Sequence, residues 1–193
     1  RHLANIPLGY QTKDILCIGE QGQTFEGEYV DFEEPSDANG FTILNIDKIE
    51  AMISYIAERV DNLFKVKLMK MLWYSDVLDF IENGCSMSGM VYQHEPMGAL
   101  PIGHYSLMNL ENLNVKEEMS YNYDTMLHVY PTANMDYSVL DDKEKTILDK
   151  VVEKFVDYKA KDIIDYMHEE KVYIETNPGE IIPFSLAREI RKF

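Results

Sequence analysis

The chain has 193 residues, and 34 acidic residues against 18 basic ones give it a formal net charge of −16 at pH 7. This charge argues against a general nucleic-acid-binding protein, because such proteins gain affinity when Lys and Arg displace counterions from phosphates. No run of apolar residues approaches the roughly 18 that a membrane-spanning helix needs, whereas the hydrophobic fraction of 46% suffices for a globular core.

The first 40 residues differ in composition from the rest of the chain. Residues 15–18 and 25–30 are apolar and β-forming, and the glycines and polar residues between them predict a hairpin of two short strands. Residues 33–40 are acidic and rich in turn-forming residues, which is typical of a linker. We therefore expect an N-terminal extension over residues 1–40 and one domain over residues 41–193.

Two helices are predicted next. Residues 47–60 carry apolar side chains at helical spacing, and Asp47 with Glu50 has the spacing of a capping box. Residues 65–81 precede Asn83 and Gly84, which suit a left-handed helix end. Because this second segment is apolar nearly all round, we expect it to be the buried central helix of the domain.

The remaining elements are shorter and alternate between extended and helical patterns. A capping-box pair, Asp141 and Glu144, marks the start of the strongest of the later helices. We expect extended segments over 90–93, 117–123 and 125–130, turns over 96–101 and 176–179, and helices over 105–113, 141–156, 160–168 and 184–191. The fold class predicted is α+β, mainly helical, with a central buried helix and a small β-hairpin element.

The sequence offers little support for catalysis. It contains neither a phosphate-binding loop nor a nucleophile elbow, and Cys17 and Cys85 form no metal-binding or disulfide pattern, so we expect a reducing cytoplasm. A metal site formed by His94, His104 and His168 with nearby carboxylates stays open as a rival, which would make the chain a metal-dependent hydrolase. The preferred interpretation is a non-enzymatic protein with no cofactor and no metal.

Several motifs, in the same order, resemble the Panacea domain of SocA-like antitoxins, which include phage-associated proteins. KLMKMLWYSD at residues 67–76 resembles the helix KLxKLLYFxD of that family. Residues 86–92, residues 96–101 and Tyr105 resemble its segment SxTGxxY, followed by PxGPVP and a later Tyr. Residues 168–173 are similar to its closing SHxExxW motif. The resemblance covers about residues 41–193.

The resemblance implies an antitoxin that directly binds and neutralises a cognate protein toxin, or an adaptor that delivers the toxin to a Clp protease. The acidic composition favours a basic toxin, since opposite charge steers the encounter. Residues 1–40 are too short and too acidic for the DNA-binding region that many family members carry, so we expect no direct nucleic-acid binding and no membrane contact. Homo-oligomerisation is left open.

Two groups of residues follow from the matched motifs. Met and aromatic side chains are enriched at protein interfaces, and several cluster between residues 87 and 108. The residues predicted to contact the toxin are Tyr92, Pro96, Gly98, Pro101, Tyr105, His168 and Tyr173. The residues predicted to organise the central helix are Lys67, Leu68, Lys70, Leu72, Tyr74 and Asp76.

Overall fold

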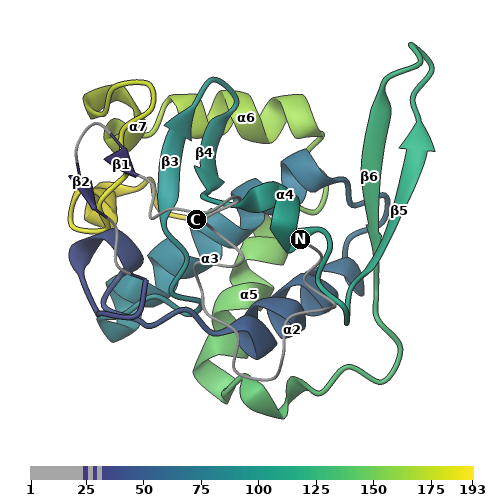
Figure 1. Ribbon diagram of the computed structural model, residues 1–193, viewed down its shortest axis with the longest axis horizontal. Coiled ribbons are helices and arrows are strands. Elements are labelled where there is room, and N and C mark those ends of the chain that lie inside the picture. The colour runs from purple at the N-terminus through teal and green to yellow at the C-terminus, as the bar shows by residue number, and fades with distance from the viewer. Residues whose placement is uncertain (1–23, 26–27, 30–31) are drawn as a thin grey trace.

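The computed structural model describes residues 24–25, 28–29 and 32–193, which form a mainly helical α+β fold (Figure 1). Its first element is a hairpin in which β1 (Thr24–Phe25) pairs antiparallel with β2 (Glu28–Tyr29). Both strands lie within or beside the segment 25–30, for which the sequence predicted a single strand. The other predicted strand, over residues 15–18, lies outside the described residues.

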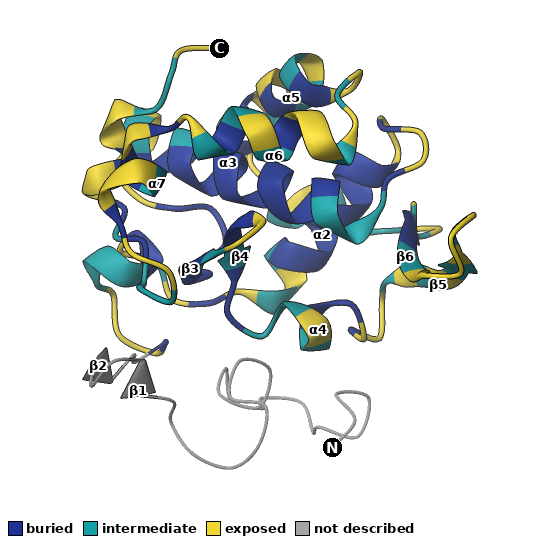
Figure 2. Ribbon diagram, turned by 90° about the horizontal axis from the view of Figure 1, so that it is seen from above, coloured by how far each residue is buried: buried dark blue, intermediate teal, exposed yellow. Residues whose placement is uncertain are grey.

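Helix α3 (Lys65–Asn83) is the centre of the domain, as the sequence predicted. It contacts α2 (Ile46–Ala57), α5 (Asp142–Phe155) and α6 (Ala160–His168), and Figure 2 shows it buried over most of its length. Leu68 and Leu72 are completely buried in the core. The helix ends as expected at Gly84, whose backbone takes the left-handed conformation and donates its N–H to the Phe80 carbonyl.

Two antiparallel hairpins follow α3. In the first, β3 (Tyr92–Glu95) pairs with β4 (Gly98–Pro101), so most of the predicted turn over 96–101 is strand and only Pro96 and Met97 form the turn. In the second, β5 (Asn114–Met119) pairs with β6 (Thr125–Tyr130). The predicted strand over 117–123 therefore begins and ends earlier, because residues 120–124 form the connecting turn.

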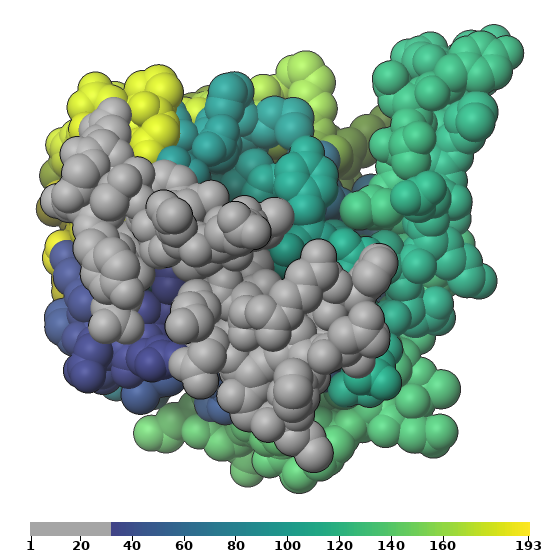
Figure 3. All heavy atoms as spheres, viewed as in Figure 1, coloured from purple at the N-terminus to yellow at the C-terminus, as the bar shows by residue number. Residues whose placement is uncertain are grey.

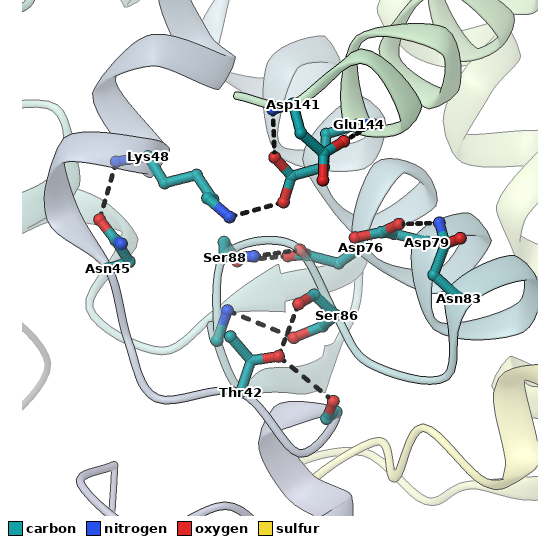
Figure 4. Close-up of polar contacts among 12 residues, drawn as sticks. Thr42, Asn45, Lys48, Asp76, Asp79, Asn83, Ser86, Ser88, Asp141 and Glu144 are labelled. Carbon is teal, nitrogen blue, oxygen red and sulfur yellow. Dashed lines mark hydrogen bonds and ion pairs between the residues drawn. The ribbon is translucent and has the colours of Figure 1, made fainter. Parts of the chain in front are cut away.

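Helix termini show which local predictions hold. The capping box of α5 is present, because Asp141 and Glu144 each accept a backbone N–H from the other. The predicted box of α2 is wrong, because Asn45 caps this helix by accepting the Lys48 N–H at 3.0 Å (Figure 4). The Glu50 carboxylate bonds to Asn112 instead. Helix α2 therefore begins at Ile46 behind an asparagine cap, and Glu50 takes part in a tertiary contact instead of a capping box.

The last predicted elements are shorter in the structure. The helix predicted over 105–113 is a single turn, α4 (His104–Leu107), and the one predicted over 184–191 is the 3-10 turn η4 (Leu186–Glu189). Helix α7 (Lys171–Glu175) and the 3-10 turn η3 (Tyr137–Val139) complete the set. None of the helices in the described part of the chain combines the length and the apolar character needed to cross a membrane.

The described part of the predicted linker packs against the domain. Phe32 is buried, and the 3-10 turn η2 (Asp37–Asn39) faces the C-terminal segment, where the Asp37 carboxylate accepts the N–H and the hydroxyl of Ser185. On its other side, the Ser86 hydroxyl donates to the Asn39 carbonyl at 2.6 Å. A domain boundary near Gly40 stays a prediction.

A buried carboxyl group joins α3 to the loop that follows it. Asp76 has no exposed surface and accepts hydrogen bonds from the Ser88 N–H at 2.8 Å and the Ser88 hydroxyl at 2.5 Å (Figure 4). It also accepts the Tyr92 hydroxyl at 2.6 Å. Burial raises the pKa of Asp76 to about 6, although the three donors oppose that rise. One side chain of α3 thus bonds to both Ser88 and Tyr92 of the loop, in addition to the bonds that Ser86 and Ser88 make with residues 39–45.

Replacing this carboxyl group gives a first test. Asp76→Asn is expected to lower the free energy of unfolding by about 2–4 kcal/mol, because an amide NH₂ then faces donors. Since the folded pKa lies above the unfolded one, Asp76 stabilises the wild-type protein more at low pH, and this contribution is lost as pH rises from about 4 to about 6. The deficit of the variant, measured by urea unfolding, should therefore narrow between about pH 4 and about pH 6 and stay constant above that range.

The matched control is Asp124→Asn, which changes an exposed carboxyl group. Its effect on unfolding should be under about 0.5 kcal/mol. A deficit of Asp76→Asn that stays constant or widens over the same pH range would contradict the assignment.

Candidate partner-binding face

The polar side chains of α3 each bond to a different part of the chain. The Lys67 ammonium donates to the Val156 carbonyl at the end of α5, at 2.7 Å. The Tyr74 hydroxyl donates at 3.0 Å to Glu170, a fully buried carboxylate between α6 and α7 that also accepts the Arg191 N–H. These residues, with Asp76, hold three segments that are distant in sequence against one helix.

A fourth contact fixes the strand β4. Lys70 has no exposed surface, and its ammonium donates to the Ala99 carbonyl at 3.0 Å. The Ala99 N–H in turn lies 3.0 Å from the Met167 sulfur of α6. Burial lowers the pKa of Lys70 to about 7, because only one carbonyl replaces its hydration shell. The strand is thereby held between α3 and α6.

Gly98 allows the hairpin to approach this closely. Its φ is +98°, in the region that favours glycine, and a Cβ at this position would lie 2.7 Å from the Met167 sulfur and 2.9 Å from Lys70 Cε. A side chain here would strain the backbone and would displace the buried Met167 and Lys70 side chains or strand β4 itself. The glycine therefore belongs to the support of the hairpin and not to its outer surface.

Rings from α6 and α7 stack with His94 of β3 and support the hairpin turn. The Tyr173 ring stacks on His94 at a centroid distance of 3.8 Å and on His168 at 4.6 Å. Two rings stacked this closely on one tyrosine must lie on its opposite faces. The Tyr173 hydroxyl donates to the Glu95 carbonyl at 2.7 Å, directly before the turn.

His94 is a neutral structural member of this stack. Its Nδ1 lies 2.9 Å from the Thr176 hydroxyl, which itself donates to the Val172 carbonyl, so the imidazole is the donor in the pair. Burial lowers the pKa of His94, and the neighbouring His168 adds to this effect. A neutral ring suits close stacking on Tyr173.

The structure divides the residues that the sequence predicted to contact a toxin. Pro96 and Tyr105 are exposed, His168 and Tyr173 are half-buried, and Tyr92, Gly98 and Pro101 are buried. The buried members lie within β3 and β4 and offer little surface to a partner. Pro96, His168 and Tyr173 come together at the β3–β4 turn.

We define the hairpin-turn face as Pro96, Met97, His168 and Tyr173. Met97, which belongs to the predicted cluster of Met and aromatic residues between 87 and 108 but is not among the seven predicted contact residues, is 47% exposed at the tip of the turn. Its position next to Pro96 was the available signal, because the two-residue turn of a tight hairpin is solvent-exposed. The face thus combines exposed apolar atoms with a rigid support.

Tyr105 lies apart on α4, beside basic groups. Its ring is 65% exposed, and the Lys65 ammonium lies 3.4 Å from the ring centroid in cation–π geometry. Burial lowers the pKa of Lys65 to about 8. Burial also lowers the pKa of His104 to about 4, and the positive charges of Lys65 and Lys70 add to this effect. Tyr105 is therefore presented on a small basic support within an acidic chain.

The histidines proposed as alternative metal ligands are arranged differently from a metal site. Among the described residues, no three side chains of His, Cys, Asp or Glu are grouped so that they could hold a metal ion. His94 and His168 lie on opposite faces of the Tyr173 ring, and His104 belongs to the α4 group with Lys65.

Comparison with known proteins gives one finding. The family model of the antitoxin SocA-like, Panacea domain matches residues 68–173, which is more than half of the chain. No curated protein and no solved structure matches the chain. The matched range contains α3 from Leu68 onward, both hairpins after it and the three stacked rings His94, Tyr173 and His168.

Two glycine substitutions test the clamp on β4. Gly98→Ala is expected to lower the free energy of unfolding by about 2–4 kcal/mol, through backbone strain and overpacking against Met167. Gly179→Ala is the matched control: its φ is also positive, at +87°, but its Cβ would meet nothing within 4 Å. The free energy of unfolding of Gly179→Ala, measured in urea, should be lower than that of the wild-type protein by about 1 kcal/mol. An equal loss of unfolding free energy in the two variants would show that the close approach of β4 to Lys70 and Met167 contributes nothing to stability.

Proposed function

Because the chain belongs to the family of SocA-like antitoxins with a Panacea domain, we propose that it is the antitoxin of a toxin–antitoxin pair and neutralises a protein toxin by direct binding. The observation that carries this proposal is the family match over residues 68–173. That range includes every residue of the hairpin-turn face, together with Lys70 of α3 and Met167 of α6, which hold β4. The matched part of the chain therefore contains a candidate binding surface and the residues that support it.

Charge indicates the kind of partner. The net charge of −16 favours a basic toxin, because complementary potentials accelerate encounter and disfavour acidic competitors. The exposed Met97 and Pro96 offer apolar contact area at the centre of the hairpin-turn face, where interfaces obtain most of their affinity. Long-range attraction and short-range apolar contact would then act in sequence.

The mechanism proposed is occlusion by a preformed surface. The β3–β4 turn is held by the Lys70 and Met167 contacts to Ala99 and by the Tyr173 hydroxyl, so little conformational entropy is lost when a partner binds. Covering the active surface of a toxin in this way requires no bond chemistry and no cofactor. It also distinguishes the antitoxin from a Clp protease adaptor, which would remove the toxin.

Co-expression with the protein encoded by the adjacent reading frame tests the proposal. That protein alone should arrest growth, this chain should restore growth, and the two should co-purify as a stable complex. Rescue accompanied by protease-dependent loss of the toxin would instead favour the adaptor. Growth arrest that this chain fails to relieve would refute the antitoxin role.

A variant pair locates the binding surface. Met97→Asp places a charge in the proposed apolar centre and should weaken binding, measured by calorimetry, by about 10-fold or more. Val156→Asp is the matched control, since Val156 is also an exposed apolar residue but lies at the end of α5. It should bind as the wild-type protein does. Equal affinity of both variants would remove the hairpin-turn face from the interface.

A further inference from the structure

The β5–β6 hairpin stands away from the body of the molecule (Figures 1 and 3). Its turn presents large side chains to solvent: Tyr121 is fully exposed, Tyr123 is 84% exposed and Met119 is 70% exposed. Isolated two-stranded hairpins are only marginally stable in water, and exposed aromatic residues add nothing to the core. A surface of this kind is typical of a contact site.

Side chains on one face keep the hairpin rigid. The Glu118 carboxylate accepts the Tyr130 hydroxyl and pairs with His128 Nδ1, each at 2.7 Å. The His128 and Tyr130 rings are stacked at a centroid distance of 4.1 Å, and Phe64 packs on His128 from the body at 4.5 Å. The hairpin is therefore presented in a fixed orientation.

The hydrogen-bond phase of the hairpin shows which backbone groups of β5 face outward. The Ser120 N–H bonds to the Asp124 carbonyl at 2.8 Å, so in this antiparallel register the residues with even numbers bond to β6. Val115, Glu117 and Met119 must then direct their N–H and C=O groups to the other side. The partner strand confirms the phase, because the outward N–H of Val129 bonds to the Leu63 carbonyl.

This outer edge of β5 has no strand beside it in the described part of the chain. The sheet there has two strands, β5 and β6, and the described backbone supplies no acceptor for the N–H groups of Val115, Glu117 and Met119. Natural proteins blunt such edges or use them to bind an extended segment of another chain. Here the edge is six residues long, rigid and flanked by exposed tyrosines.

We propose that β5 binds an extended basic segment of the partner protein as a third strand, with Tyr121 and Tyr123 packing over the end of that segment. The proposal rests on the proposed function, because the partner is the same toxin, and it assigns a second contact surface beside the hairpin-turn face. Backbone bonds along β5 supply affinity, and a basic side chain opposite Glu117 supplies specificity.

Charge favours a basic partner over a second copy of the chain. Glu117 is exposed at the middle of the edge, and Asp124 is exposed at the turn. Antiparallel self-pairing centred on Glu117 would place two Glu117 carboxylates directly opposite each other, with Lys116 opposite Glu118 on either side, between chains that each carry a net charge of −16. A cationic side chain placed opposite Glu117 would instead meet opposite charge at the middle of the edge, and the net charge of the chain would attract the segment that carries it.

Hydrogen exchange on the unmodified proteins tests the edge directly. The amides of Val115, Glu117 and Met119 should exchange rapidly in the free chain and slow by about 10-fold or more in the complex with the adjacent-frame protein. Unchanged exchange at these three amides in a complex that does neutralise the toxin would overturn the edge proposal and leave the antitoxin role standing. Failure to neutralise or bind would instead refute the antitoxin role, and the edge proposal with it.

Variants separate the backbone contribution from the charge. Glu117→Pro removes an outward N–H without touching the bonds to β6, and Glu117→Lys reverses the charge; each should weaken binding by about 10-fold or more. Glu153→Lys, an equal charge change at an exposed position of α5, should bind like the wild-type protein. Wild-type affinity for both Glu117 variants would overturn the proposal. The proposal would also be overturned if the wild-type protein sedimented as a dimer and the Glu117→Pro variant sedimented as a monomer, because the edge would then serve self-association.

Discussion

Polar side chains buried on α3 must find hydrogen-bond partners inside the protein, and this requirement organises the rest of the fold. A buried polar group without a partner costs about 1–3 kcal/mol, and a buried charge costs more. Lys67, Lys70, Tyr74 and Asp76 satisfy the requirement with the end of α5, strand β4, the α6–α7 junction and the loop before β3. One helix therefore determines where four otherwise unrelated segments lie.

The same arrangement explains why the hairpin turn is rigid. Lys70 bonds to the strand directly, and Met167 contacts the neighbouring N–H from α6. Gly98 makes this approach sterically feasible, while the ring stack on Tyr173 supports the turn from α7. A turn held from three sides loses little entropy on binding, which suits a protein that acts by contact.

The two proposed contact surfaces differ in physical character. The hairpin-turn face offers compact apolar side chains over a packed base, so its affinity would come from shape and burial. The β5 edge offers backbone groups and a carboxylate on a projecting hairpin, so its affinity would come from strand pairing and charge. Together they would allow a single acidic domain to contact a partner at two separate places.

Short-range patterns in the sequence were sufficient for much of the helical framework. The apolar periodicity of residues 65–81, the left-handed end at Gly84 and the capping box at Asp141 are all found in the structure, because each depends on neighbours within a few residues. The order of motifs along the chain was also sufficient to recognise the family, which the match over residues 68–173 supports.

Only the tertiary structure decided which motif residues reach the surface. Tyr92 and Gly98 share a segment with Pro96, yet they are buried because Asp76 bonds to Tyr92 and because Lys70 and Met167 lie against Gly98. Likewise, Glu50 left its predicted capping position to bond Asn112, and the open edge of β5 follows from a strand register that no local pattern specifies. Burial and pairing depend on residues far apart in sequence, so a single sequence indicates the helices more reliably than the faces they present.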